Sequence, residues 1–227
     1  MKLSNWPYYD SEEIQKVSNC LISGKVNYWT GEEGKLFESE FSEFIGANYS
    51  IAMANGTLAL NAAYRSLGLS EGDEFITTPR TFIATSSCGI LLGAKPIFAD
   101  INPESGSITS KTIEPLINSS TKAIVVVHLG GWPAEMDEIC KLAKSYGIAV
   151  IEDCSQAHSA KFKNMHVGTF GDIATWSFCQ DKILSTGGEG GMVTTNNQEL
   201  WSKMWEMRDH GKSLEAIEKN KDQKGFK

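Results

Sequence analysis

The sequence predicts an α/β fold in which a mainly parallel sheet is sandwiched by helices. Two observations point to it: short apolar runs alternate with helix-length segments from Tyr49 onward, and these runs are apolar on both faces. Strands that are buried on both faces and separated by helices form parallel sheets covered on both sides. No repeat or low-complexity linker interrupts the alternation, which indicates one main domain.

Two helices are expected before the alternation begins. Asp10–Glu13 has the form of a capping box and predicts a helix that ends near Gly24. Aromatic and apolar residues at helical spacing between positions 37 and 45 predict a second helix, which ends at Gly46. Residues 1–48 are therefore interpreted as an N-terminal helical segment.

The alternating part is predicted to hold seven strands and the helices that connect them. Each strand is an apolar run of a few residues, and each gap is long enough for a crossover helix. In chain order, strands are expected at 50–54, 74–77, 96–101, 123–128, 148–152, 172–178 and 191–195. Helices are expected up to 67, up to 92, around 111–117, over 134–146 and over 198–210. The polar residues 212–227 have no expected packing partner.

Charge and composition exclude several classes of protein. The chain has 227 residues, 41% of them hydrophobic, and a formal net charge of −7, which is typical of a folded protein with one core. Nucleic acid is not an expected partner, because binding it requires a clustered basic surface. The basic residues that do gather lie near the end of the chain: Lys219, Lys221, Lys224 and Lys227.

Neither a membrane segment nor an export signal is expected. The longest apolar runs are far too short to span a membrane, and the first residues lack the apolar core of a signal peptide. The five cysteines form no C-x-x-C pair, which argues against a disulfide framework and a zinc ribbon. These features predict a cytoplasmic protein without membrane contact.

Ligands of open α/β sheets bind at the carboxyl ends of the strands, so the residues there are the functional candidates. At the first such junction, Asn55, Gly56 and Thr57 open a helix. The free amides of a helix start, together with the Thr57 hydroxyl, suit a phosphate group. A plain N-cap without any ligand is the commoner use of these residue types.

Asp153 ends a strand that is expected to be central and buried. A buried carboxylate needs a cation or several donors, so Asp153 is expected to face a metal ion or a protonated ring nitrogen. The metal is the poorer choice, because no further ligands stand at suitable spacing and His158 and His166 are interpreted as structural. Glu152 should point to the opposite face, where a structural pairing is expected.

Lys182 lies between a strand and the glycine-rich loop 187–191. A lysine held in a rigid turn is partly desolvated, which favours the neutral amine that attacks carbonyl groups. Most lysines are simply solvated at the surface. The loop is no dinucleotide fingerprint, and Gly211-Lys-Ser is no P-loop, because Glu206 stands where the first glycine is required.

Two further residues complete the candidate set. Ser177 ends the strand before Lys182 and offers another hydroxyl donor, while Phe82 can stack on a flat ring, although core packing is its commoner role. The junctions together offer a phosphate seat, a ring face, an anion for a ring nitrogen and an amine for a carbonyl. Pyridoxal 5′-phosphate has all four complementary groups, and its chemistry requires a lysine and an acid at the pyridine nitrogen. It is the expected cofactor, with no metal.

A series of ordered motifs between about Tyr28 and Gly211 carries a family resemblance. They are Asn55–Leu60, Gly72–Phe75, Thr81–Thr85, Gly93–Pro96, Val127–Pro133, Ile151–His158, Ser177–Lys182 and Gly188–Gly191. In this order they resemble the DegT/DnrJ/EryC1/StrS sugar aminotransferases, a branch of the fold-type-I pyridoxal phosphate enzymes. The resemblance implies an aspartate aminotransferase-like large domain over residues 49–211.

The resemblance also implies roles for the candidate residues. Lys182 would form the covalent imine with the cofactor and shuttle the proton, Asp153 would pair with the pyridine nitrogen, and Gln156 would approach the ring oxygen or ring face. The other implied contacts are Gly56, Thr57 and Ser177 on the phosphate and Phe82 stacked on the ring.

The implied reaction transfers an amino group, typically from glutamate, to a keto group of a nucleotide-linked deoxysugar. Such sugars enter surface polysaccharide, lipopolysaccharide O-antigen or glycosylated natural products. Related sugar dehydratases carry a histidine in place of the lysine, so Lys182 favours the transaminase.

The resemblance finally implies that family members continue into a smaller carboxyl-terminal domain. A G-x-N-x-R segment of that domain serves the phosphate site of the neighbouring subunit, and this chain is expected to be truncated before it. A homodimer is expected for the complete protein. The alternative is a truncated, catalytically impaired fragment that acts as a non-catalytic partner or has no activity. An NAD-dependent sugar enzyme ranks last because the fingerprint is missing.

Overall fold

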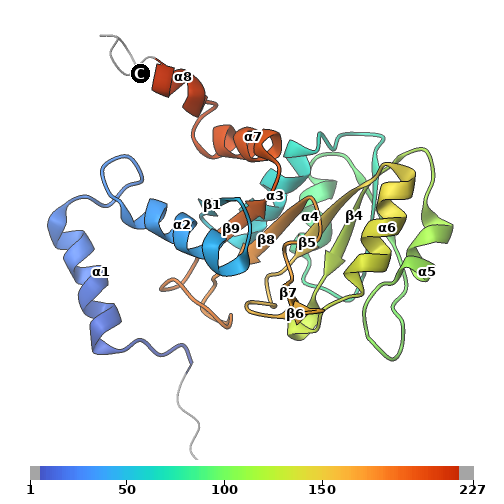
Figure 1. The fold of residues 1–227 in the computed structure, drawn as a ribbon, viewed down its shortest axis with the longest axis horizontal. Coiled ribbons are helices and arrows are strands. Elements are labelled where there is room, and N and C mark those ends of the chain that lie inside the picture. Colours follow the sequence, from blue (N-terminus) through green and yellow to red (C-terminus); the bar gives the residue numbers. More distant parts are fainter. Residues whose placement is uncertain (1–5, 220–227) are drawn as a thin grey trace, which may run out of the picture.

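The computed structural model describes residues 6–219 and contains a seven-stranded sheet with the strand order β1-β9-β8-β5-β4-β2-β3 (Figure 1). The pairs β2–β3, β2–β4, β4–β5 and β5–β8 are parallel, whereas β9 is antiparallel to both of its neighbours, β1 and β8. The expected mainly parallel sheet is confirmed. The strands are β1 (Tyr49–Met53), β2 (Glu74–Thr77), β3 (Lys95–Phe98), β4 (Thr121–Val127), β5 (Ala149–Asp153), β8 (Ile173–Ser177) and β9 (Gly191–Thr195).

Helices cover both faces of the sheet, because successive strand residues point to opposite sides. Ile151 and Ile173 pack on one face with residues of α3 and α7, while Val150 packs on the other face with residues of α6. A third cluster joins α2 to β8 and β9. The helices of the sandwich are α2 (Glu33–Ile45), α3 (Gly56–Ser66), α4 (Ala84–Ile90), α5 (Ser110–Ile113), α6 (Met136–Tyr146) and α7 (Gln198–Arg208).

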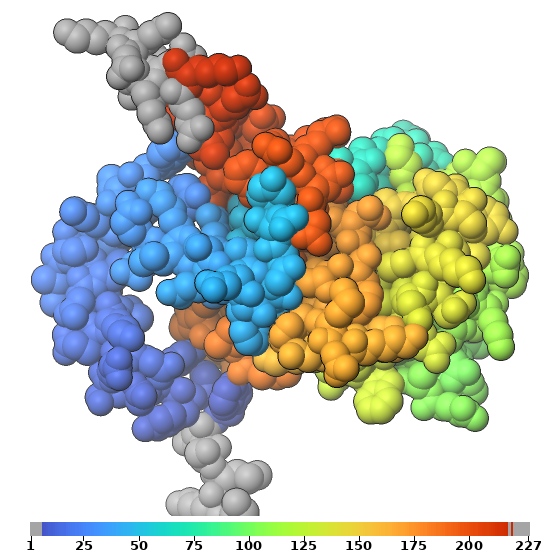
Figure 2. Space-filling model, viewed as in Figure 1, coloured from blue at the N-terminus to red at the C-terminus, as the bar shows by residue number. Residues whose placement is uncertain are grey.

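Helix α1 (Ser11–Ser23) has the local signals that the sequence predicts but contributes no residue to the core. Asp10 and Glu13 form the reciprocal capping box, and Gly24 ends the helix with φ 68°. None of its residues is buried, and it lies at the margin of the molecule (Figure 2). By contrast, α2 buries Phe41 and Ile45 against the sheet and is part of the core.

Local turn chemistry produces elements that the apolar pattern did not indicate. Helix α5 is a single turn and passes into a 3-10 turn at Glu114–Leu116, because Pro115 cannot donate the next helical hydrogen bond. Strands β6 (Lys161–Phe162) and β7 (Met165–His166) form a separate hairpin. Its two turn residues, Lys163 and Asn164, both have positive φ, as the tightest hairpin turns require.

The expectation that residues 212–227 lack a packing partner is wrong for the part that the structure describes. Helix α8 (Leu214–Lys219) follows α7, and its Leu214 and Ile217 pack on the cluster of α3 and α7. The charged residues of this helix, Glu215, Glu218 and Lys219, had hidden the apolar pair. Residues 220–227, including Lys221, Lys224 and Lys227, lie outside the described residues. Within 6–219, no helix is long and apolar enough to cross a membrane.

Candidate functional site

A cavity of about 470 Å³ lies where β1, β2, β5 and β8 end, a size typical of small-molecule sites. Its wall draws on each of the four junctions that the sequence singles out. The seven candidate residues all line it: Gly56, Thr57, Phe82, Asp153, Gln156, Ser177 and Lys182. The other lining residues are Asn55, Leu60, Thr81, Ala84, Val127, Ser155, Cys179, Asp181 and Glu189.

The start of α3 offers free backbone amides to the cavity. Asn55 is the N-cap, and its side chain accepts from the amide of Leu58 at 2.9 Å. The first amides of a helix have no partner within it, so the N–H groups of Gly56 and Thr57 stay available beside the exposed Thr57 hydroxyl. The sequence offered an N-cap and a phosphate-binding site as alternatives. In the structure Asn55 caps the helix while the amides of Gly56 and Thr57 remain available, so the two roles are compatible.

Gly56 has a reason to be glycine that is independent of any ligand. A Cβ at this position would lie 2.8 Å from the Cβ of Ser177, so the helix start presses directly on the end of β8. Gly191 is constrained in the same way, because a Cβ there would lie 2.4 Å from the carbonyl carbon of Asn55. This close packing places the Ser177 hydroxyl beside the free amides of α3.

Asp153 ends β5 and is 4% exposed. Its Oδ1 accepts from the amide of Ser155 at 3.1 Å and its Oδ2 accepts from Oγ1 of Thr85 at 2.8 Å. Among residues 6–219, no ion pair involves this carboxylate. Burial, followed by the nearby Asp153 charge, raises the pKa of Cys88 to about 11. The site holds a buried anion without a cation.

Lys182 sits in a turn that hydrogen bonds fix on both sides. Its amide donates to the carbonyl of Cys179 at 2.9 Å, and the amide of Gln180 donates to the carbonyl of Gly188 at 3.0 Å. The lysine side chain is 17% exposed, and its Nζ lies 3.1 Å from Oδ2 of Asp181. This contact lowers the pKa of Asp181, so the two side chains form an ion pair at the cavity.

Phe82 and Gln156 reach the cavity in different ways. Phe82 is 65% exposed, so core packing is excluded as its role and its ring face stays free. Gln156 is fixed by the loop after β4, because the amide of Gly130 donates to its Oε1 at 2.8 Å. With the oxygen occupied, the amide nitrogen of Gln156 is the group left to donate to a ligand.

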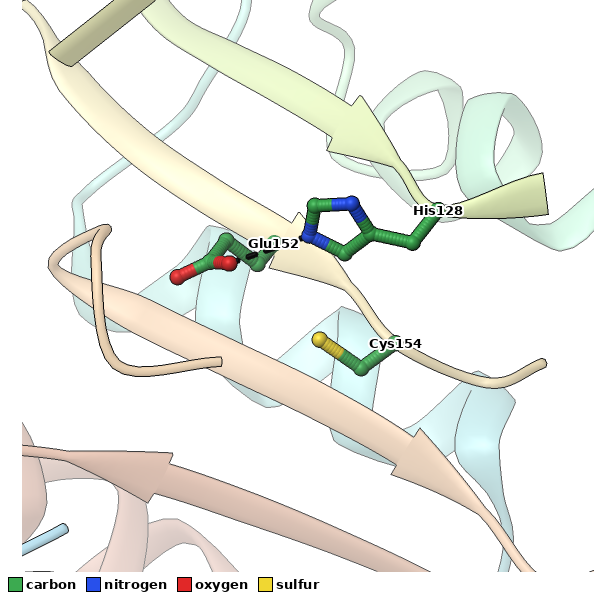
Figure 3. Close-up of side chains that lie close together, drawn as sticks. All are labelled: His128, Glu152 and Cys154. Carbon is green, nitrogen blue, oxygen red and sulfur yellow. Dashed lines mark hydrogen bonds and ion pairs between the residues drawn. The ribbon is translucent and has the colours of Figure 1, made fainter. Parts of the chain in front are cut away.

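Behind the cavity wall, Glu152 forms the structural pairing that its position predicts. Its Oε2 accepts from Nε2 of His128 at 3.0 Å, a contact marked in Figure 3. The same oxygen accepts from the amide of Gly168 at 2.7 Å. Its Oε1 accepts from the amides of Phe170 and Gly171 at 2.8 and 2.7 Å. All of these groups are inside the protein, so the carboxylate is fully satisfied without a ligand.

Cys154 lies close to this pair. Potential ligand atoms of His128, Glu152 and Cys154 lie within 4.8 Å of one another (Figure 3). However, Nδ1 of His128 accepts from the amide of Ala134 at 3.2 Å, which leaves its Nε2 as the donor to Glu152. Burial, followed by the charges of Glu152 and Asp153, raises the pKa of the Cys154 thiol well above its usual value. Both ring nitrogens of His128 are therefore used within the protein.

Sequence reasoning missed several residues of the site. Thr85 was noted only within a family motif, yet it is the side-chain partner of Asp153, and Asp181 pairs with Lys182. Cys179 and Glu189 also line the cavity, and Sγ of Cys179 lies 3.6 Å from Oε1 of Glu189. No local signal marks Thr85, because its partner Asp153 is 68 positions away in the sequence. The signal for Asp181 is its place next to the lysine.

In chemical terms, the cavity combines the amine of Lys182, the buried carboxylate of Asp153 and the exposed ring of Phe82. It also offers neutral amide and hydroxyl donors of the kind that bind phosphate groups. An amine attacks an aldehyde or ketone, and a buried carboxylate stabilises a protonated nitrogen. The arrangement therefore fits a flat, nitrogen-containing, carbonyl-bearing ligand with an anionic group.

Comparison with known proteins gives a consistent picture. Residues 7–227 match the DegT/DnrJ/EryC1/StrS aminotransferase family. GDP-perosamine synthase of Escherichia coli O157:H7 is 42% identical over 209 residues, which are 90% of this chain and 56% of that protein. The chain thus spans about half the length of the relatives it matches.

Solved structures agree with the sequence match. An aminotransferase from Psychrobacter cryohalolentis is 50% identical, with a TM-score of 0.97 over 100% of this chain and 57% of that one. NtdA of Bacillus subtilis, solved with the bound cofactor PMP, is 30% identical, with a TM-score of 0.84 over 100% of this chain and 52% of that one.

Proposed function

The chain belongs to the DegT/DnrJ/EryC1/StrS aminotransferase family, and on that premise we propose that it uses pyridoxal 5′-phosphate to move an amino group from an amino acid to a keto sugar. One observation carries the proposal: Lys182, Asp153 and the open start of α3 converge on one cavity. The donor is proposed to be glutamate, and the acceptor a keto group of a nucleotide-linked deoxysugar.

The residues fit this cofactor in charge as well as in position. Asp153 is a buried carboxylate without a cation, which suits a protonated pyridine nitrogen. Gly56, Thr57 and Ser177 would hold the phosphate through amides and hydroxyls, and the free ring of Phe82 would cover the pyridine face. When bound, the cofactor supplies an electron sink for the carbon that carries the amino group.

The catalytic work of the chain falls to Lys182. If the cofactor is bound, Nζ of Lys182 would hold its aldehyde, and this Nζ has to be free of its proton and of Asp181 to do so, because a protonated amine has no lone pair. The same Nζ would hold or move a proton at the reacting carbon of the substrate. Asp153 would face the ring nitrogen and favour its protonated form. Gln156, whose Oε1 accepts from the amide of Gly130, would have its side-chain nitrogen free to donate to the ring oxygen.

The wider biological setting is part of the same proposal. The similarity to GDP-perosamine synthase supports a nucleotide sugar as acceptor. The product is proposed to enter polysaccharide or lipopolysaccharide O-antigen. The five cysteines are all free thiols, which supports a reducing, cytoplasmic location. The assembly is proposed to be a homodimer, with residues 49–211 as the cofactor-binding domain between the helical segment 1–48 and the tail 212–227.

Trapping with borohydride tests the proposal directly. The chain is incubated with pyridoxal phosphate, reduced with borohydride and digested, and the modified peptide is identified by mass spectrometry. The adduct is expected on Lys182 and is expected to disappear in Lys182→Ala. Lys163→Ala, which removes an exposed lysine outside the cavity, serves as the control and should trap as well as wild type. Undiminished trapping in Lys182→Ala contradicts the proposal.

A further inference from the structure

A short chain of hydroxyl groups leads from the cavity to Asp153. Thr85 lies in the first turn of α4 and is 0% exposed, and its Oγ1 donates to Oδ2 of Asp153 at 2.8 Å. Thr81, which lines the cavity, has its Oγ1 2.9 Å from Oγ1 of Thr85. The three side chains come from two elements, the entry to α4 and the end of β5, which the sheet brings together.

The direction of these hydrogen bonds follows from the groups themselves. A charged carboxylate can only accept, so the single hydroxyl hydrogen of Thr85 goes to Asp153. The contact between the two threonines must then be filled by the hydrogen of Thr81. Both hydroxyls point toward the carboxylate, and each polarises the next, which strengthens the charge-assisted bond at the end of the chain.

The position of Thr85 does not itself depend on this hydroxyl. The backbone carbonyl of Thr85 accepts from the hydroxyl of Tyr64 at 2.5 Å, and the residue belongs to a hydrogen-bonded helix. A valine would fill nearly the same space and keep both features. The hydroxyl of Thr85 is therefore used for its contacts with Asp153 and Thr81.

We propose that Thr85 is a positioning residue, with Thr81 as its outer partner, that fixes the Asp153 carboxylate for a protonated ring nitrogen. The inference rests on the proposed function, because it assigns the ring of pyridoxal phosphate to this carboxylate. Thr85 on Oδ2 and the Ser155 amide on Oδ1 prevent rotation of the group. The lone pairs that remain are held toward the cavity.

The test uses Thr85→Val, the conservative variant Thr85→Ser and the matched control Thr77→Val. Thr77 is equally buried, and its hydroxyl donates to the carbonyl of Val125 at 3.0 Å, away from Asp153. Pyridoxal phosphate affinity is measured by absorbance titration. A hydrogen bond to a charged group predicts about a tenfold or greater loss of affinity in Thr85→Val. Thr85→Ser should regain most of it, and Thr77→Val should bind as wild type.

A second measurement, made without cofactor, tests only the contact between the Thr85 hydroxyl and Asp153. Urea unfolding of wild type, Thr85→Val, Asp153→Ala and the double variant forms a double-mutant cycle. The destabilisation caused by Thr85→Val should shrink markedly once Asp153 is alanine. Additive effects would overturn the inference, as would unchanged cofactor affinity in Thr85→Val. A wild-type chain that binds no pyridoxal phosphate would instead contradict the proposed function, while the cycle still decides whether Thr85 serves Asp153.

Discussion

Glu152 and Asp153 are neighbours in sequence, both buried at the end of β5, yet the protein treats them in opposite ways. Glu152 faces a closed region where His128 and three backbone amides satisfy its carboxylate. Asp153 faces the cavity, and its carboxylate has one amide and one hydroxyl as partners but no ion pair within residues 6–219. The comparison teaches that burial alone does not mark a functional acid. What distinguishes Asp153 is that its set of partners is incomplete.

Mutation of Glu152, the carboxylate whose partners all lie within the protein, should have the largest effect on stability. Glu152→Ala leaves the imidazole N–H and three amides without a partner, so we expect the free energy of unfolding to fall by about 4 kcal/mol. Urea denaturation measures it. Glu104→Ala, at an exposed loop position, is the control and should change the value by less than about 0.5 kcal/mol. A similarly small loss in Glu152→Ala would break the distinction between the two carboxylates.

A second prediction concerns pH and the buried histidine His158. His158 packs between the rings of Trp176 and Phe178, and burial is the main reason that its pKa falls to about 4. Because the folded pKa lies below the unfolded value, the unfolded chain binds the proton first as pH falls. Stability is therefore fully present above about pH 6.5 and declines toward pH 4, by about 3 kcal/mol in all from this group.

The variant His158→Gln isolates this effect, since glutamine does not titrate. The difference in unfolding free energy between variant and wild type should move in favour of the variant as pH falls from 7.5 to 4.5. Urea titrations at several pH values measure it. An unchanged difference across this range would show that the histidine takes up its proton as readily in the folded chain.

Mutation of Asp153, the carboxylate that faces the cavity, should give the smallest change in the free energy of unfolding. Its sign should be opposite to that of the loss expected for Glu152→Ala. Asp153→Asn removes a buried charge that no cation balances, so the cofactor-free chain should be as stable as wild type or more stable by about 1 kcal/mol. At the same time, pyridoxal phosphate should no longer raise the melting temperature as it does in wild type. Thermal unfolding with and without the cofactor measures both. A large loss of stability without cofactor would place Asp153 with the structural carboxylates.

Much of the fold was readable from the sequence because local patterns decide it. The alternation of apolar runs gave β2 and β9 at their observed bounds, and the capping box of α1 is present as predicted. The antiparallel direction of β9 could not be predicted, because the position and direction of a strand in the sheet depend on its contacts with distant segments. The β6–β7 hairpin and α8 were missed, since one is too short for a pattern and the other has a single apolar pair.

The site divides in the same way. Gly56, Asp153 and Lys182 could be selected because junctions after strands converge at one edge of a parallel sheet, and all three line the cavity. Thr85 could not, because its role depends on a contact across 68 positions between α4 and β5. The reason for glycine at position 56 was also hidden, since it lies in the packing of α3 on β8 and not in the local turn.

The visible absorbance spectrum of the purified chain with pyridoxal phosphate, recorded before and after glutamate is added, tests the central claim most directly. Because Lys182 and Asp153 both line the cavity, we expect a new absorbance band when the cofactor is added. This band should change when glutamate is added. A folded chain that gives no such band would contradict the assignment of this cavity to the cofactor.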